Sequence, residues 1–265
     1  MKNLLSIIIM CVFIFSCKKK DSKEQEQVQP PVATSIDGIV ISGLPSNLNG
    51  INGVFIAQKG MYYTPAGYAS YYYGIVYLTH VSQSLQNIGL SLGNFVGQDN
   101  GGVLKLNNTT FKYYSIQNCY VDTSAAQNYS TGINWDLGGN TLFEPFNANI
   151  TSGFPILNTS NFFPTSISKT QSVTVNFGTN NISNLDSLSV AISDGSGTIF
   201  YTQKMLPVTS NSVSFTVSDL SNIPLSTPNT RFLMSLNKYS YMFKGNKKYL
   251  FIMRTFLSSN VTVNP

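Results

Sequence analysis

The sequence predicts an all-β protein, and three observations support this class. Apolar residues alternate with Ser, Thr and Asn over several short stretches, as at Val173, Val175 and Phe177. Gly, Asn, Asp and Pro cluster between these stretches, and only 10% of the 265 residues are charged. Alternation with a period of two places one set of side chains on a core and the other in water, as in a half-buried antiparallel strand. Coiled coils and helix bundles, which are rich in charged residues, are excluded.

The first element is a short apolar segment. Lys2 precedes an apolar run from Leu4 to Phe15, which is about a dozen residues, or roughly 18 Å as a helix. Spanning the hydrocarbon layer of a membrane takes about 20 residues, so the run predicts an export signal rather than a permanent transmembrane helix. It stops at Ser16-Cys17, and the polar segment Lys18–Glu26 follows at once.

These residues resemble a bacterial lipoprotein signal, in which an aliphatic stretch and a small residue precede a cysteine that becomes lipidated. Ser16 and Cys17 match this pattern and Ile14 is the aliphatic residue, whereas Phe15 stands where the family prefers a small side chain. The resemblance implies a signal peptide over 1–16 and a lipidated Cys17. Because Lys18 stands where Asp would signal retention at the inner membrane, it also implies an outer-membrane location, with the periplasmic face and the cell surface both open. An ordinary secretory signal, with Cys17 as an incidental thiol, is the alternative.

Residues 17–35 form the next segment and offer almost no apolar side chain to a core. Lys, Glu, Gln, Asp and Ser dominate it, and Pro30-Pro31 lies near its end. This composition predicts a flexible tether, with an average reach of about 25 Å. Acyl chains on Cys17 contribute about 0.8 kcal/mol for each buried methylene, so a membrane is the predicted partner of this end of the chain.

The first predicted domain spans 36–163 and is β-rich but irregular. Its expected strands are Ile36–Ser42, Val54–Gln58, Tyr71–Leu78, Ile88–Val96, Val103–Leu106 and Thr110–Ser115. Asn107-Asn108 fits a two-residue hairpin turn. Only Val81–Asn87 has the pattern of a turn or two of helix, and the part from Gly132 to Pro164 predicts loops with short strands.

The second predicted domain spans 164–265 and shows the cleaner alternation. Strands are expected at 173–177, 188–192, 198–205, 213–217, 231–237, 248–256 and 261–263. Lys244-Gly245-Asn246-Lys247 is one of the turn signals between them. Seven strands in about 100 residues resemble an immunoglobulin- or fibronectin-like β-sandwich. No Cys or Trp follows Trp135, so the antibody-type disulfide and its packed Trp are absent. The fold expected for the whole chain is therefore two antiparallel β domains behind a signal and a tether.

The sequence assembles no catalytic site. Ser91 lies in Gly89–Gly93, which matches the G-x-S-x-G nucleophile elbow, but no helix pattern follows and the single histidine, His80, precedes the serine; the elbow requires the opposite order. Ser166 and Lys169 match S-x-x-K without its helix. The acidic residues lie singly in segments rich in turn residues: Asp37, Asp99, Asp122, Asp136, Glu144, Asp186, Asp194 and Asp219. We therefore predict no catalytic residue, no metal and no cofactor.

Cys119 is the last cysteine of the chain. With Cys17 acylated, it has no partner for a disulfide within one molecule. Cys119 is expected to be a small buried hydrophobic residue rather than a nucleophile.

The least ordinary feature of the sequence is a cluster of tyrosines interleaved with Gly, Ala, Ser and Pro. Tyrosine rings offer large amphipathic contact area at low entropy cost, and small residues between them are typical of binding loops. A glycan or a protein is the ligand class that this surface suits. The alternative is that these residues are ordinary strand tyrosines that line a sheet. The predicted ligand-binding residues are Tyr62, Tyr63, Tyr68, Tyr71, Tyr72 and Tyr73.

Together these features predict a non-enzymatic outer-membrane or cell-surface lipoprotein that acts as a binding or envelope-interaction module. Two alternatives stay open: a hydrolase of glycan or peptidoglycan in which loop carboxylates converge, and a purely structural adhesin or spacer. Basic and aromatic residues mix over Lys238–Arg254, a combination found in nucleic-acid-binding proteins. No nucleic-acid partner is expected, because a lipid-tethered exported protein rarely meets one.

Overall fold

The computed structural model describes residues 41–43, 48–64, 67–122, 129, 132–158, 162–178, 181–195, 197, 199–225 and 230–265. The predicted signal peptide at 1–16, the tether at 17–35 and Cys17 lie outside the described residues. None of the helices in the described part is long and apolar enough to cross a membrane.

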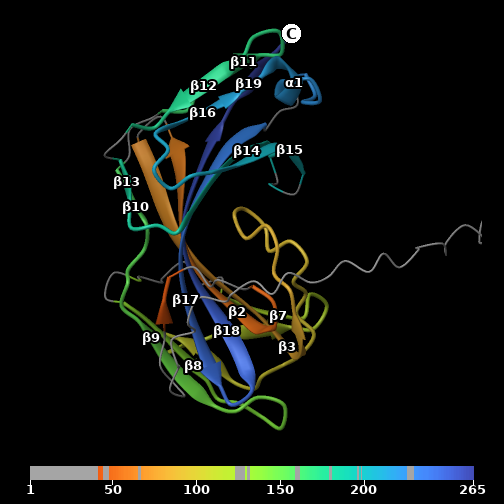
Figure 1. Ribbon diagram of the computed structural model, residues 1–265, viewed down its shortest axis with the longest axis vertical. Helices are drawn as coiled ribbons and strands as arrows, with labels where there is room; N and C mark the ends of the chain where they lie inside the picture. The colour runs from red at the N-terminus through yellow and green to blue at the C-terminus, as the bar shows by residue number, and fades with distance from the viewer. Residues whose placement is uncertain are drawn as a thin grey trace, which may run out of the picture. The chain divides into compact units, whose positions relative to one another are not determined.

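The all-β prediction is confirmed (Figure 1). A nine-stranded sheet dominates, and α1 (Val217–Leu220) is the one helix among the described residues. Eight strands follow one another across this sheet, and β1 (Ile41–Ser42) pairs with β17 beside them. Their order is β15 (Phe200–Leu206), β14 (Ser187–Ser193), β17 (Arg231–Lys244), β18 (Lys247–Asn260), β2 (Ile51–Thr64), β3 (Gly67–Gln83), β7 (Cys119–Asp122) and β6 (Lys112–Tyr114).

Four long strands, β17, β18, β2 and β3, form the centre of this sheet. β17 and β18 form a hairpin that pairs Arg231 with Asn260 at one end and Lys244 with Lys247 at the other, so the predicted turn is confirmed. β18 then pairs with β2 in parallel, while the other pairs of the sheet are antiparallel. Both faces of β17 and β18 are largely buried, and consecutive apolar residues at 232–234 and 249–253 agree with burial on both faces. These strands therefore extend beyond the predicted 231–237 and 248–256.

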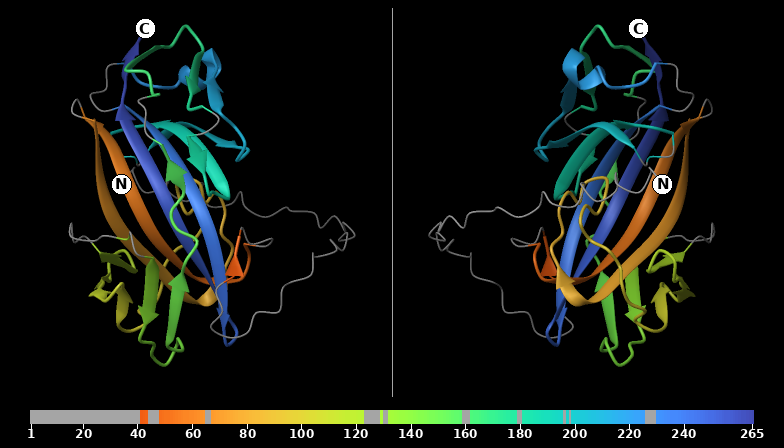
Figure 2. Two further views of the ribbon diagram at one scale, coloured as in Figure 1. Left: turned by 90° about the vertical axis from the view of Figure 1, so that its left-hand side faces the viewer. Right: turned by 90° about the vertical axis from the view of Figure 1, so that its right-hand side faces the viewer.

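Four smaller sheets lie beside the large one (Figures 1 and 2). One contains β5 (Thr109–Thr110), β4 (Leu104–Leu106), β8 (Ile133–Leu137) and β9 (Phe146–Ile150). The others are β12 (Val173–Asn176) with β16 (Ser212–Phe215), β10 (Ile156–Leu157) with β13 (Ile182–Ser183), and β11 (Ser166–Ser168) with β19 (Thr262–Asn264). Asn107 and Asn108 both have positive φ angles between β4 and β5, as the predicted hairpin turn requires.

Two hydrophobic clusters lie on one face of the large sheet. The first packs β2, β3 and β18 against β4, β8 and β9, with the rings of Phe55 and Trp135 edge to face at 5.3 Å between centroids. The second packs β14, β17 and the end of β18 against β12, β16 and α1 in a sandwich-like arrangement, with Phe163 stacked on Phe232 at 5.1 Å. Burial of these side chains supplies most of the driving force for the fold.

On the opposite face, the segment after β3 folds back over the sheet. Leu85, Ile88 and Phe95 pack there against Ile56 and Ile252. The predicted strand Ile88–Val96 is wrong, because this segment consists of turns and loop. Its apolar residues are buried as the alternation suggested, but they cover a sheet rather than belong to one.

The predicted division at residues 163 and 164 can be compared with the hydrophobic clusters and the large sheet. The first hydrophobic cluster draws mainly on residues before the division and the second mainly on residues after it, yet β18 contributes to both. Because β18 also pairs with β2, strands from both sides of the division share one sheet. Residues Thr34–Pro265 form one compact unit.

Candidate functional site

Three of the predicted tyrosines line a hollow at one end of the large sheet. Its volume is about 300 Å³, and it is bordered by Tyr62, Tyr63, Tyr71, Arg231, Ser258 and Asn260. The lining residues come from β2, β3, β17 and β18, which Figure 2 shows side by side with β2 and β3 in orange and β17 and β18 in blue. Tyr62, Tyr63 and Tyr71 are 45%, 39% and 41% exposed, so part of each residue is open to a ligand.

Strand register explains why these side chains meet, apart from that of Tyr63, which follows Tyr62 near the end of β2. Tyr62 is paired with Ser258 across the parallel β2 and β18 strands, and Arg231 is paired with Asn260 in the β17–β18 hairpin. Paired residues lie on the same face of a sheet. The alternate residues Met61 and Leu257 point to the other face, into the second hydrophobic cluster. The same period of two that buries one set of side chains thus exposes the hollow.

The ring of Tyr71 occupies the space left by a glycine on the neighbouring strand. Gly60 is paired with Tyr71, and a Cβ atom at Gly60 would lie 2.0 Å from Cζ of the tyrosine ring. The ring therefore covers the backbone of β2, at 6.5 Å between centroids from the ring of Tyr62. Burial raises the pKa of Tyr71, opposed by a hydrogen bond with Gln58 and by the positive charge of Arg231.

Arg231 supplies the positive charge of the hollow. Its Nε donates a hydrogen bond to Oδ1 of Asn260 at 3.1 Å. Among the described residues, no carboxylate lies within 4.0 Å of Arg231 to form an ion pair. The hollow thus combines exposed aromatic rings, one unneutralised guanidinium group and two uncharged polar side chains.

The other predicted tyrosines have different positions. Tyr72 points to the opposite face, where its ring packs against Tyr129 and Phe154 at 5.0 and 6.2 Å between centroids. It packs against the first hydrophobic cluster and does not line the hollow, because neighbouring residues of a strand alternate between faces. Tyr73 shares the face of Tyr71 two residues farther along β3 but does not line the hollow. The side chain of Tyr68 lies outside the described residues.

Sequence reasoning did not find Arg231, Ser258 and Asn260. They lie more than 150 residues after the tyrosine cluster, and nothing local connects the two segments. The parallel pairing of β18 with β2 brings these residues beside the tyrosines, and no short-range sequence pattern predicts such a pairing.

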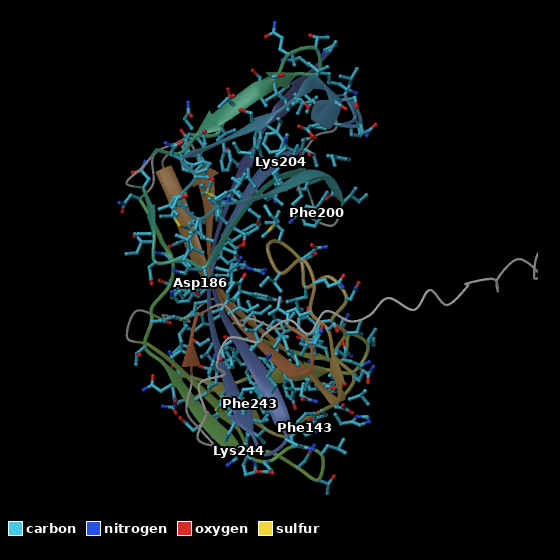
Figure 3. The ribbon with its side chains drawn as sticks, in the orientation of Figure 1. Phe143, Asp186, Phe200, Lys204, Phe243 and Lys244 are labelled. Carbon is cyan, nitrogen blue, oxygen red and sulfur yellow. The ribbon has the colours of Figure 1, made fainter. Side chains whose placement is uncertain are left out.

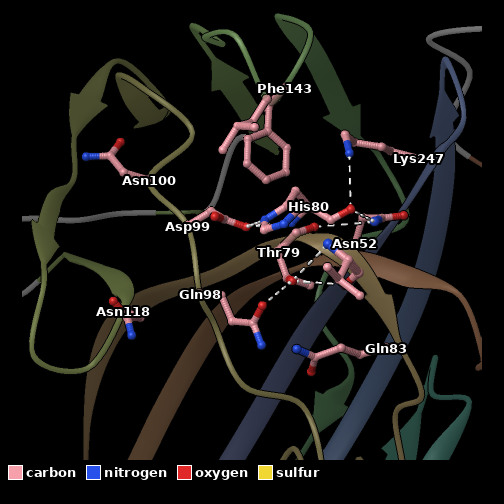
Figure 4. Close-up of polar contacts among 12 residues, drawn as sticks. Asn52, Thr79, His80, Gln83, Gln98, Asp99, Asn100, Asn118, Phe143 and Lys247 are labelled. Atoms are coloured by element: carbon pink, nitrogen blue, oxygen red, sulfur yellow. Dashed lines mark hydrogen bonds and ion pairs between the residues drawn. The ribbon is translucent and has the colours of Figure 1, made fainter.

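A second polar cluster surrounds the single histidine, His80, at the far end of β3 (Figure 4). His80 Nδ1 lies 2.8 Å from Oδ2 of Asp99, and Nζ of Lys247 donates to the His80 carbonyl oxygen at 3.5 Å. Asn52 Nδ2 donates to the carbonyl oxygens of Thr79 and His80 at 3.3 and 3.4 Å. These contacts join β2, β3 and the β17–β18 hairpin, so the cluster has a structural role.

A second hollow, of about 260 Å³, lies near that cluster and is lined by Phe143, Glu144, Lys244 and Lys247, among others. Figure 3 shows Phe143, Phe243 and Lys244 together at this end of the large sheet. Lys247 lies over the ring of Phe143 at 5.2 Å, and Lys244 Nζ is 4.0 Å from Oε2 of Glu144. Its charges already have partners, unlike that of Arg231.

Two of the described carboxylates have separate basic partners. Asp186 accepts from Lys238 Nζ at 3.0 Å and from the Tyr239 backbone. Asp219 lies 2.7 Å from Lys204 Nζ at the start of α1. Among the described residues, no group of three His, Cys, Asp or Glu side chains could hold a metal ion.

Cys119 is buried on β7, as expected, and carries a free thiol. Burial raises the pKa of this thiol. A raised pKa disfavours the thiolate, which is the nucleophilic form.

Arg254 is a buried cation on the face that carries the hollow, four residues before Ser258 on β18. Its Nε donates to Oδ1 of Asn237 at 2.8 Å, and its Nη2 donates to the Ile88 carbonyl oxygen at 3.1 Å. Burial lowers the pKa of Arg254, opposed by Tyr239 and Tyr77. Arg254 thus fastens the segment after β3 to the sheet.

Comparison with models of known protein families and with curated proteins finds no match to this chain.

Proposed function

We propose that this protein is a non-enzymatic, lipid-anchored binding module of the outer membrane or cell surface, and that the hollow lined by Tyr62, Tyr63 and Tyr71 holds a saccharide. One observation carries the proposal: exposed rings from two strands converge with Arg231, Ser258 and Asn260 around a hollow of about 300 Å³. That volume is at the lower end of the range for small-molecule sites.

The chemistry of the lining suits a sugar. A sugar ring has apolar C–H faces that stack on tyrosine, and hydroxyl groups around its rim that need hydrogen-bonding partners. Ser258 and Asn260 provide such partners beside the rings of Tyr62 and Tyr71. Aromatic contacts are worth about 0.5–1.5 kcal/mol each beyond the area that they bury, so two or three rings suffice for a weak to moderate affinity.

The anchor rests on the sequence segments 1–16 and 17–35. Acylation of Cys17 would attach the chain to a membrane, and a tether with a reach of about 25 Å would hold residues Thr34–Pro265 clear of the lipid headgroups. An anchored binding module needs no catalytic group.

The anchor is tested by metabolic labelling with a fatty-acid analogue, comparing the wild-type chain with Cys17→Ala. We expect label and membrane association in the wild type and neither in the variant. Protease accessibility on intact cells then distinguishes the cell surface from the periplasmic face. An unlabelled wild-type chain released into the medium would overturn the anchor.

The binding site is tested by calorimetric titration of the full chain with a panel of oligosaccharides. Tyr62→Ala and Tyr71→Ala are expected to weaken binding about fivefold each, the equivalent of about 1 kcal/mol. Tyr114→Ala on the outermost strand β6 is the matched control, because Tyr114 lies outside the hollow. Equal losses in all three variants would contradict the site. Turnover of a bound oligosaccharide, abolished by replacing one acidic residue, would favour the hydrolase, and absence of any ligand would favour the spacer.

A further inference from the structure

We infer that the saccharide is acidic, and that Arg231 recognises its carboxylate group. This inference rests on the proposed function of the same hollow and specifies the class of sugar. The observation behind it is that the lining contains one cation and no anion: Arg231 stands among Tyr62, Tyr63, Tyr71, Ser258 and Asn260.

The first argument concerns the charge of Arg231. Several other cations near hollows or on the sheet have acidic or aromatic partners: Lys204 has Asp219, Lys238 has Asp186, Lys244 has Glu144 and Lys247 has the ring of Phe143. Arg231 has no carboxylate within ion-pair distance in the part of the chain that the structure describes. A ligand anion would therefore meet a cation that is not already neutralised.

The second argument concerns the geometry of the guanidinium group. Asn260 accepts a hydrogen bond from Nε of Arg231 at 3.1 Å, which restrains the side chain through one of its five N–H donors. The remaining donors belong to the two terminal nitrogens, and a planar fork of this kind matches the two oxygens of a carboxylate. The cross-strand neighbour thus orients the group without consuming the donors that a carboxylate needs.

The third argument is that charge and rings act on the same sugar unit. The positive charge of Arg231 affects the Tyr71 hydroxyl, and Tyr71 and Arg231 border one hollow. A sugar ring stacked on Tyr71 would place a carboxyl substituent on its rim beside Arg231. A uronic acid unit has this combination of an apolar ring face and a carboxylate at the rim. A free carboxylate or an acidic peptide lacks the sugar ring.

The test uses the full chain and matched pairs of probes: oligogalacturonate, oligomannuronate and oligoglucuronate, each with its carboxyl-reduced, neutral counterpart. In calorimetric titrations, at least one acidic probe is expected to bind at least about tenfold more tightly than its neutral counterpart. Raising the salt concentration is expected to reduce this difference. Two further probes test anions of other chemistry: a sulfated derivative of an uncharged oligosaccharide, and oligoglutamate.

Arg231→Gln is expected to remove the preference, because it weakens binding of the acidic probe at least about tenfold more than binding of its neutral counterpart. Arg231→Lys keeps the charge but not the fork, and is expected to retain only part of the preference. Tyr71→Ala is expected to weaken both probes alike. Circular dichroism and thermal unfolding of each variant establish that it is folded. The preference of the wild-type chain for acidic over neutral probes is measured without any variant.

The outcomes separate the two proposals. Equal binding of acidic and neutral probes, or equal losses for both in Arg231→Gln, would overturn the acidic-sugar inference and leave the saccharide site standing. Stronger binding of the sulfated probe or of oligoglutamate than of every uronic acid would overturn it as well. Binding of no saccharide at millimolar concentration would overturn the proposed function itself.

Discussion

Gly60→Ala tests whether a glycine on β2 sets the position of the Tyr71 ring in the hollow. A Cβ atom at Gly60 would lie 2.0, 2.3 and 2.5 Å from three carbons of that ring, and ordinary contacts begin at 3.4 Å. The ring must therefore retreat by about 1.4 Å, the difference between 2.0 and 3.4 Å. Gly60 does not occupy the left-handed region of backbone angles, so alanine itself fits the strand.

The expected effect is on binding rather than on stability. Replacing glycine by alanine where the backbone permits it stabilises a protein by about 0.4–1 kcal/mol through the unfolded state. Loss of the contact between the Tyr71 ring and the β2 backbone offsets this gain, so the free energy of unfolding should stay within about 0.5 kcal/mol of the wild type. Affinity for the saccharide should fall about fivefold, the equivalent of about 1 kcal/mol, because the stacking surface is displaced.

A double-mutant cycle provides the assay and its control. Titration calorimetry and denaturant unfolding are performed on Gly60→Ala, Tyr71→Ala and the double variant. In the Tyr71→Ala background, Gly60→Ala should no longer affect affinity and should stabilise the fold by about 0.4–1 kcal/mol. The reasoning is refuted if Gly60→Ala weakens binding equally in both backgrounds, or if it leaves the affinity of the wild-type background unchanged.

Three further predictions concern stability. Asn237→Ala should lower the free energy of unfolding by about 3 kcal/mol in denaturant titrations, because it removes the acceptor of the buried Arg254 Nε; a loss below about 1 kcal/mol would contradict this role. Lys204 and Thr216 lower the pKa of the Asp219 carboxyl group below its ordinary 3.8. The contacts of the ionised carboxylate therefore stabilise the folded state above pH 3.8, and this stabilisation is lost as the pH falls through the lowered pKa. Asp219→Asn should accordingly cost up to about 1 kcal/mol at pH 7 and nothing in strong acid, and an equal cost at both pH values would refute it. Burial raises the pKa of Tyr120 from 10.0 to about 12, so the unfolded chain ionises at a lower pH than the folded one. The free energy of unfolding should therefore decline as the pH rises from 10 towards 12 in the wild type, and should decline less in Tyr120→Phe. Urea unfolding at each pH measures both.

The sequence predicts the parts of the fold that depend on local patterns. Clean alternation at 173–177 and 188–192 corresponds to β12 and β14, and the turn at Lys244–Lys247 and the Asn107-Asn108 hairpin follow from the residues that tolerate such turns. The same logic failed at Ile88–Val96, because apolar alternation there serves burial over a sheet and not pairing within one.

For the candidate site, the sequence by itself determined the kind of surface: a tyrosine-rich segment with small residues between the rings. Only the tertiary structure decided which rings share a face, so that Tyr62 and Tyr71 border the hollow while Tyr72 packs against the first hydrophobic cluster. It also brought Arg231 beside them through the parallel pairing of β18 with β2. The physical reason is that a shift of one residue in strand register moves every side chain to the other face, and register between distant strands depends on packing of the whole sheet rather than on any local run of residues.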